Sequence, residues 1–298
     1  MAQERRYVKR EGAPLMTTTL WDYRSQNYPG SRQGNPDFAG ATPSYIIWNL
    51  LQRYTQPKWL VVDPMAGSGT TLDVARDLSR RALGYDLKPT RKDIFRADAR
   101  HLPLESGKAD FVFVDPPYST HLKYSEEEEC IGELDARVGP EYFSAMESVI
   151  AEVHRILRRD RYLALYVSDS ARKGKSFVPL GFELFHRLRR HFTPVDIVAV
   201  VRHNRTLKRD HWHESAAEGG YFLRGFNYLL IMKKEIGAKK ATSGVGRSSS
   251  KAGPSKHRAS KRRPKNAATK PRAKPVANSR SKSPSKSQPK SRSKTPKS

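Results

Sequence analysis

Two short segments of the chain combine residues that can do chemistry. The run Asp-Pro-Pro-Tyr at residues 115–118 follows the apolar stretch 111–114, and the run Asp-Pro-Met-Ala-Gly-Ser-Gly-Thr-Thr at residues 63–71 follows the apolar stretch 59–62. A glycine-rich turn after a strand lets the backbone approach a nucleoside ligand closely. A carboxylate followed by two prolines offers hydrogen-bond acceptors to an amino group. Together the two runs predict a nucleoside cofactor beside the amino group of a nucleobase.

The exocyclic amine of a nucleobase is a poor nucleophile because its lone pair is delocalised into the ring. Acceptors on both amine hydrogens shift that lone pair toward an electrophile. Asp115 provides a carboxylate, and Pro116 provides a carbonyl that the Pro-Pro turn leaves free. Tyr118 offers a face on which an unpaired base can stack. The predicted catalytic residues are Asp115, Pro116, Pro117 and Tyr118.

The strands and helices that must position these runs can be predicted from the apolar pattern. Short apolar stretches alternate with segments whose apolar residues have helical spacing. We expect strands at 59–63, 82–86, 94–98, 110–115, 162–167, 195–201 and 228–232, and helices at 45–54, 71–80, 141–158 and 180–191. Strands separated by helices imply crossover connections and a mostly parallel, doubly wound α/β sheet. The last two predicted strands have no obvious helix between them, so we expect an antiparallel pair at one edge.

A ligand of such a sheet lies beyond the carboxyl ends of the strands, where the sequence predicts three acidic side chains. Asp63 ends the first strand, Asp86 ends the next and can accept both ribose hydroxyls, and Asp98 ends the third and can meet an adenine amino group. The alternatives are a purely structural turn and aspartates that cap helices. A phosphate-binding loop is disfavoured because no lysine follows the second glycine of the turn. The cofactor-binding residues predicted here are Asp63, Pro64, Ala66, Gly67, Ser68, Gly69, Thr70, Asp86 and Asp98.

The two runs resemble those of the amino-methyltransferases of the Asp-Pro-Pro-Tyr type, which transfer a methyl group from S-adenosylmethionine to adenine N6 or cytosine N4 in DNA. The resemblance implies a class I methyltransferase (Rossmann-like) fold, S-adenosylmethionine as cofactor, and catalysis by positioning and electrostatics without a metal. It also implies that a Thr-Pro segment before a helix helps to hold the methionine part of the cofactor. Asn35, Thr42 and Pro43 correspond to that segment, and a strap that only packs on the sheet is the alternative. Aspartate at position 115 favours adenine slightly.

The segment 202–227 between the last two predicted strands is basic and aromatic. Basic side chains contact phosphates and aromatic rings stack on unpaired bases, so we expect a substrate surface here; a solvated loop is the alternative. The run His-Trp-His-Glu at 211–214 lacks the i, i+4 spacing of a helical metal pair, and we predict no metal site. The predicted substrate-binding residues are Arg202, His203, Arg205, Lys208 and Trp212.

The charge of the chain is concentrated at its C-terminal end. Residues 237–298 contain 20 Lys and Arg, no Asp or Glu and no Phe, Trp or Tyr, which leaves 36 basic and 30 acidic residues in the first 236. Such a segment cannot bury a core. We expect an irregular leader at 1–40, a methyltransferase domain at 41–236, and a disordered tail at 237–298 that binds nucleic acid phosphates in a salt-dependent way. A solubilising linker is the alternative for the tail.

Other features limit the class of protein. A single cysteine, Cys130, excludes a disulfide framework and a multi-cysteine zinc site. No stretch approaches the roughly 20 apolar residues of a membrane span, and the N-terminal residues do not lead into the apolar part of a signal peptide. We therefore expect a cytoplasmic, nucleoid-associated protein.

The leading interpretation is an S-adenosylmethionine-dependent DNA amino-methyltransferase whose partner is DNA, with RNA as a possible substrate. The chain leaves no room for a separate target-recognition domain of roughly 100 residues, which favours a short recognition site. The alternative enzyme is an RNA guanine-N2 methyltransferase, because those proteins share the glycine turn and a similar Pro-Pro-Tyr. A non-catalytic, nucleoid-organising DNA binder is the third interpretation, and it leaves both runs unexplained.

Overall fold

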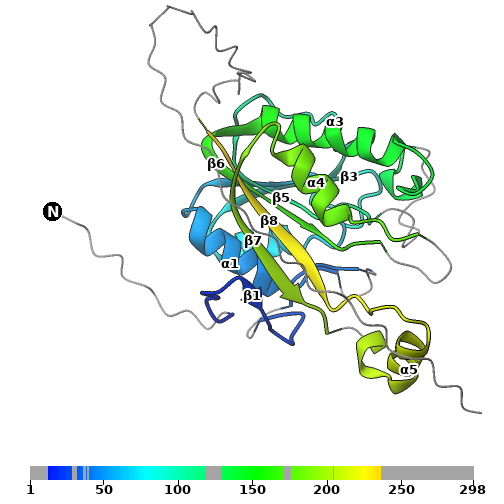
Figure 1. Cartoon of the computed structure of the whole chain (residues 1–298). Helices are drawn as coiled ribbons and strands as arrows, with labels where there is room; N and C mark the ends of the chain where they lie inside the picture. The colour runs from blue at the N-terminus through cyan, green and yellow to red at the C-terminus, as the bar shows by residue number, and fades with distance from the viewer. Residues whose placement is uncertain are drawn as a thin grey trace, which may run out of the picture. The chain divides into compact units, whose positions relative to one another are not determined.

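A mixed β-sheet is the frame of the protein (Figure 1). The computed structural model describes residues 13–28, 32–35, 38, 40–118, 129–170, 176–203 and 205–235. The strands in these residues are β1 (Leu20–Trp21), β2 (Leu60–Asp63), β3 (Arg81–Asp86), β4 (Ile94–Arg96), β5 (Ala109–Val114), β6 (Leu157–Val167), β7 (Thr193–Val201) and β8 (Phe226–Lys234). The helices are α1 (Ser44–Tyr54), α2 (Thr70–Asp77), α3 (Glu141–Ile156), α4 (Leu180–Leu188) and α5 (Asp210–Glu218), with short 3₁₀ helices at Ile131–Glu133 and Arg205–Lys208.

The strands lie in the order β1-β7-β8-β6-β5-β2-β3-β4. β8 runs antiparallel to both of its neighbours, β6 and β7, and the remaining pairs are parallel. This mostly parallel order with one reversed strand near the edge is the class I methyltransferase arrangement, so the predicted fold class is confirmed. The predicted tail, 237–298, and part of the predicted leader, 1–40, lie outside the described residues.

Several predicted elements differ from the observed ones. α5 lies between β7 and β8, where no helix was expected; Ala216 is its only buried residue, so no apolar repeat reveals it in the sequence. The predicted helix 141–158 ends at Ile156, and β6 begins directly after it. The start of this strand was missed because residues 158–161 are polar. β1 is also new, and two residues are too few for an alternating pattern. No helix in the described residues has the length and apolar character needed to cross a membrane.

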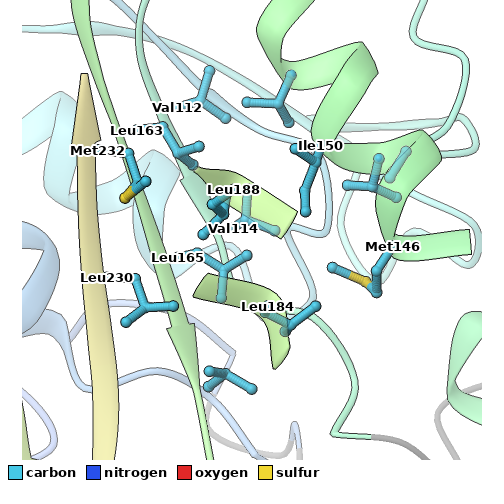
Figure 2. Packing of buried hydrophobic residues seen from close by; sticks show 14 of the residues in the cluster. Val112, Val114, Met146, Ile150, Leu163, Leu165, Leu184, Leu188, Leu230 and Met232 are labelled. Carbon is cyan, nitrogen blue, oxygen red and sulfur yellow. The ribbon is translucent and has the colours of Figure 1, made fainter. Parts of the chain in front are cut away.

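The two faces of the sheet bury alternate residues of the same strands. On one face Val112 and Leu163 pack with Met146 and Ile150 of α3 and with α4 (Figure 2). On the other face Phe111 packs with α1 and α2. Burial of each large apolar side chain contributes about 1.5–3 kcal/mol. Because every residue of β5 is buried, the carboxyl end of this strand is held firmly in the centre of the sheet.

The described part of the leader packs on the face that α1 covers. Trp21 and Tyr28 are buried in the same cluster as α1, and β1 pairs in parallel with β7. The Ser44 hydroxyl at the start of α1 donates to the Gln26 carbonyl at 3.2 Å. The leader thus brings residues 23–26 to the edge of the sheet where the strands β2, β3 and β5 end.

Candidate active site

A cavity of about 920 Å³ lies at the carboxyl ends of β2, β3 and β5. The turn that follows β2 lines one part of it, and Asp115, directly after β5, lines another. The two runs that carry the predicted chemistry, 63–71 and 115–118, therefore meet in a single cavity. Of the predicted cofactor residues, those that line the cavity are Thr42, Asp63, Pro64, Ala66, Gly67, Ser68, Thr70, Asp86 and Asp98.

The glycine turn requires backbone angles that favour glycine. Gly67 has φ of 46° and Gly69 has φ of 79°. A Cβ at Gly67 would lie 2.9 Å from the ring of Phe38, and one at Gly69 would lie 2.5 Å from the Arg91 guanidinium. Gly67 lines the cavity, whereas Gly69 does not. Gly69 is thus needed for the turn and for the packing of Arg91, and Gly67 is the glycine that faces the ligand space.

Asp63 holds this turn in place. Its Oδ2 accepts from the Thr71 hydroxyl at 2.6 Å, and its Oδ1 accepts from the Met65 backbone N–H at 3.0 Å. The side chain is buried, and this burial raises the pKa of Asp63 to about 7. The predicted contact of Asp63 with the cofactor remains a prediction; the structure gives this residue an internal role as well.

The Asp86 carboxylate, at the end of β3, can accept further hydrogen bonds. Its Oδ2 accepts from the Gly67 N–H and its Oδ1 from the Lys88 N–H, both at 2.9 Å. Each carboxylate oxygen has a second lone pair, so two ribose hydroxyls can still donate to it. Burial raises the pKa of Asp86. The Thr90 hydroxyl donates to the Gly67 carbonyl at 2.6 Å and fixes the turn against the segment after β3.

Asp98 lines the cavity and forms an ion pair with Arg100. Arg100 Nη2 lies 2.6 Å from Asp98 Oδ2, and the backbone N–H of Arg100 donates to Asp98 Oδ1 at 2.9 Å. Burial acts to raise the pKa of Asp98, but the hydrogen bonds from Arg100 outweigh it and hold the pKa below its ordinary value. Asp98 is therefore charged, and part of its acceptor capacity is already used.

Two hydroxyl groups orient the Asp115 carboxylate. Oδ2 accepts from Thr42 at 2.5 Å and Oδ1 accepts from Tyr118 at 2.9 Å. Thr42 was expected before a helix, in the segment that helps to hold the methionine part of the cofactor. The helix begins at Ser44, and the Thr42 hydroxyl donates to Asp115. Burial raises the pKa of Asp115 to about 7, although both hydroxyls act to lower it. A carboxylate with such a pKa can take up a proton near neutral pH.

The two prolines of the run differ in position. Pro117 lines the cavity, and its carbonyl accepts from the Tyr142 hydroxyl at 2.9 Å. Pro116 is buried and does not line the cavity. The predicted role of the Pro116 carbonyl as second acceptor for the amine therefore remains a prediction. Asn35 also lies away from the cavity, and its N–H donates to the Ser68 carbonyl at 2.8 Å.

The predicted substrate residues separate into two groups. Arg202 and His203 line the cavity; Arg202 Nη1 donates to the Ser168 hydroxyl at 3.3 Å. Lys208 and Trp212 are exposed and do not line it. The Arg205 side chain lies outside the described residues. The structure does not bring this predicted set together.

Three buried aromatic or amide side chains of the cavity were not predicted from the sequence. Tyr45, Tyr166 and Asn227 line it and are buried. Tyr45 was read as an apolar position of a helix, and the other two stand among the core residues of strands. The polar character of Asn227 at the start of an apolar run is the one signal that could have drawn attention to it.

Fold and cavity together define the architecture of a class I methyltransferase. S-adenosylmethionine carries ribose hydroxyls, an adenine amine and a positive sulfonium, and the carboxylates of Asp86 and Asp98 are of the type that binds these groups. Residues 2–97 match the family described as DNA methylase, which is about a third of the chain. The match includes the turn 63–71 and Asp86, and it supports an S-adenosylmethionine-dependent methyltransferase. No curated protein matches the chain.

Solved structures resemble the chain only distantly. TrmN from Thermus thermophilus is 18% identical with a TM-score of 0.43, over 66% of this chain and 50% of that one. A protein described as a DNA modification methylase, also from Thermus thermophilus, is 22% identical with a TM-score of 0.33, over 49% of this chain and 54% of that one. A Burkholderia thailandensis 1,6-didemethyltoxoflavin-N1-methyltransferase is 18% identical with a TM-score of 0.41, over 67% of this chain and 80% of that one. The chain spans about half the length of the two Thermus proteins.

Proposed function

We propose that the protein transfers a methyl group from S-adenosylmethionine to the exocyclic amine of a DNA base, with adenine N6 slightly favoured over cytosine N4. One observation carries the proposal: Asp115 lines the same cavity as the turn 63–71 and Asp86. The reaction requires an acceptor for the amine beside a binding site for the nucleoside, and this shared cavity supports the proposal.

The side chains of the cavity account for activation of the amine. When bound, S-adenosylmethionine supplies an activated methyl group. The Asp115 carboxylate accepts a hydrogen bond from the amine and localises the nitrogen lone pair, while Thr42 and Tyr118 hold its two oxygens in place. The proton that the amine loses on methylation can pass to Asp115, whose pKa of about 7 suits both acceptance and release at neutral pH.

Three features support a nucleic acid substrate, and the first of them favours DNA over RNA. The matched family is described as DNA methylase. Arg202 supplies positive charge at the cavity, where a phosphate of the target strand would lie. The 20 Lys and Arg of residues 237–298 supply a sequence-independent affinity for phosphates.

The test is transfer of labelled methyl from S-adenosylmethionine to DNA and to RNA in parallel, followed by digestion to nucleosides and identification by mass. The full chain is compared with Asp115→Asn and with Asp196→Asn, a carboxylate that is exposed on β7 away from the cavity. We expect N6-methyladenine or N4-methylcytosine in DNA, lost only in Asp115→Asn. Label found only in RNA as methylguanine would support the alternative enzyme. Absence of label in both nucleic acids together with absence of cofactor binding would refute the proposal.

A further inference from the structure

A row of polar side chains crosses the face of the sheet that α1 covers. Phe111 of β5 and Ala164 of β6 face this side, so Asp115 and Tyr166, which continue the alternation, face it too. Tyr166 pairs in register with Leu229 of β8, and Asn227 stands two residues before Leu229 on the same face. Tyr166 and Asn227 therefore stand on β6 and β8, and Asp115 directly follows the adjacent strand β5, all at the edge where the cavity lies.

Tyr45 of α1 lies over this row. It is buried in the same cluster as Tyr166, and its ring contacts that of Tyr23 with centroids 5.0 Å apart. Neighbouring strands are roughly 4.8 Å apart, so Asp115 and Asn227, with β6 between them, are separated by roughly 10 Å at the backbone. A nucleobase whose amine meets Asp115 would extend along the row toward Asn227.

Two atoms of this group are buried without a partner. Among the described residues, the Tyr45 hydroxyl and the Asn227 Oδ1 make no hydrogen bond, and the two residues are 1% and 7% exposed. The Asn227 side chain lies beside Tyr166, and its amide acts to lower the pKa of that phenol against the effect of burial. An amide lowers the pKa of a phenol by directing its N–H toward the oxygen, so Oδ1 is left for another partner. Buried polar groups are nearly always paired, so an unpaired donor and an unpaired acceptor in one cavity indicate a polar ligand.

We propose that the Tyr45 hydroxyl and the Asn227 Oδ1 bind the ring edge of the target base and determine which base is accepted, with Tyr166 as a positioning residue. This inference rests on the proposed function. Each amine-bearing base has a ring nitrogen beside the carbon that carries the amine, and the Tyr45 hydroxyl can donate to it. The Asn227 oxygen lies beyond that nitrogen, where adenine presents its C2–H as a weak donor and cytosine presents its O2 carbonyl, so the pair favours adenine.

The test uses the full chain and the variants Tyr45→Phe, Asn227→Leu and Tyr166→Phe. Tyr162→Phe is the matched control, because Tyr162 lies on the same strand and the same face as Tyr166 but away from the cavity. For Tyr45→Phe and Asn227→Leu we expect kcat/KM to fall roughly 10-fold while the Kd for S-adenosylhomocysteine stays unchanged. For Tyr166→Phe we expect a loss that disappears in the Asn227→Leu background. Tyr162→Phe should change neither quantity.

Substrate analogues show whether the lost contact is to the base. In the target position, adenine is replaced by 1-deazaadenine, or cytosine by 3-deazacytosine; each analogue lacks the ring nitrogen beside the amine. The wild-type protein should lose activity on the analogue, and Tyr45→Phe should show no further loss on it. A fully additive loss for Tyr45→Phe, or unchanged kcat/KM in both variants, would overturn the assignment.

A stability measurement separates this inference from the proposed function. Because the Tyr45 hydroxyl has no partner among the described residues of the free protein, Tyr45→Phe should leave Tm equal or raise it by a few degrees. A clear drop in Tm would mean that the hydroxyl is paired without a ligand, and this result would overturn the inference whatever the substrate. A wild-type protein that methylates no nucleic acid, with Tm of Tyr45→Phe unchanged or raised, would instead contradict the proposed function alone.

Discussion

Replacement of Asp115 by asparagine should separate activity from stability. Asparagine has nearly the same shape as aspartate, and the hydroxyls of Thr42 and Tyr118 can rotate to accept from its amide. In the proposed reaction, the variant loses the negative charge that activates the amine and the site that takes its proton. We expect kcat to fall at least 100-fold, in the range of about 10²–10⁴ found when a single electrostatic or acid–base group of an active site is removed.

The same change should stabilise the folded protein at alkaline pH. Burial raises the pKa of Asp115 from 3.8 to about 7, so the folded protein binds more protons than the unfolded chain between these values. Stability is therefore lost as pH rises through this window, and the loss is complete above the folded-state pKa. At about 1.4 kcal/mol per pKa unit, ionised Asp115 costs up to about 4 kcal/mol at pH 8 and less than half of that at pH 5. Asparagine carries no such cost.

Urea unfolding of the wild-type protein and Asp115→Asn at pH 8 and pH 5 measures this difference, with Asp196→Asn as the control. We expect the free energy of unfolding of Asp115→Asn to exceed that of the wild type by a few kcal/mol at pH 8, and by clearly less at pH 5. Methyl transfer by the same samples gives the activity. An inactive variant with no gain at pH 8 would show that the Asp115 carboxylate is not destabilised by burial. A variant that keeps the wild-type kcat would refute its catalytic role.

Further predictions concern pH, the turn and the tail. Since the proposed reaction needs ionised Asp115, kcat/KM should rise with pH to a plateau above about 7, and a flat profile between pH 5 and 8 would contradict this. Gly69→Ala should lower the free energy of unfolding by about 3 kcal/mol, because φ is 79° and the new Cβ would displace Arg91. Gly107→Ala, where φ is 65° and no atom lies within 4 Å, should cost only about 1 kcal/mol, and equal costs would refute the packing argument. Removal of residues 237–298 should weaken DNA binding and flatten its salt dependence, measured by fluorescence anisotropy between about 50 and 200 mM salt; an unchanged slope would exclude the tail from phosphate binding.

Most strands and helices of the sheet and its covering layers could be predicted, because the pattern of apolar residues within each segment indicates them. The apolar stretches of β2 and β5 and the helical repeat of α3 predict their elements to within one or two residues at most ends. α5 was missed because it is mostly exposed and carries no apolar face. The start of β6 was placed too late because residues 158–161 are polar. Leu157 pairs with Ala109 and Arg161 pairs with Lys234 through backbone groups, which leave no trace in side-chain hydropathy.

By itself, the sequence determined that the two runs would lie at one edge of the sheet. An Asp-Pro-Pro-Tyr run and a glycine turn at the ends of buried strands have to meet, because parallel strands bring their carboxyl ends to one edge. Only the tertiary structure decided which side chains from other elements of the fold lie at that edge beside the two runs. Thr42 bonds to Asp115 across the cavity, and Asn227 lies two strands from it, because β8 runs antiparallel between β6 and β7. The proximity of these residues to Asp115 depends on strand order and on the packing of α1. Neither can be read from the sequence around residues that lie far apart in the chain.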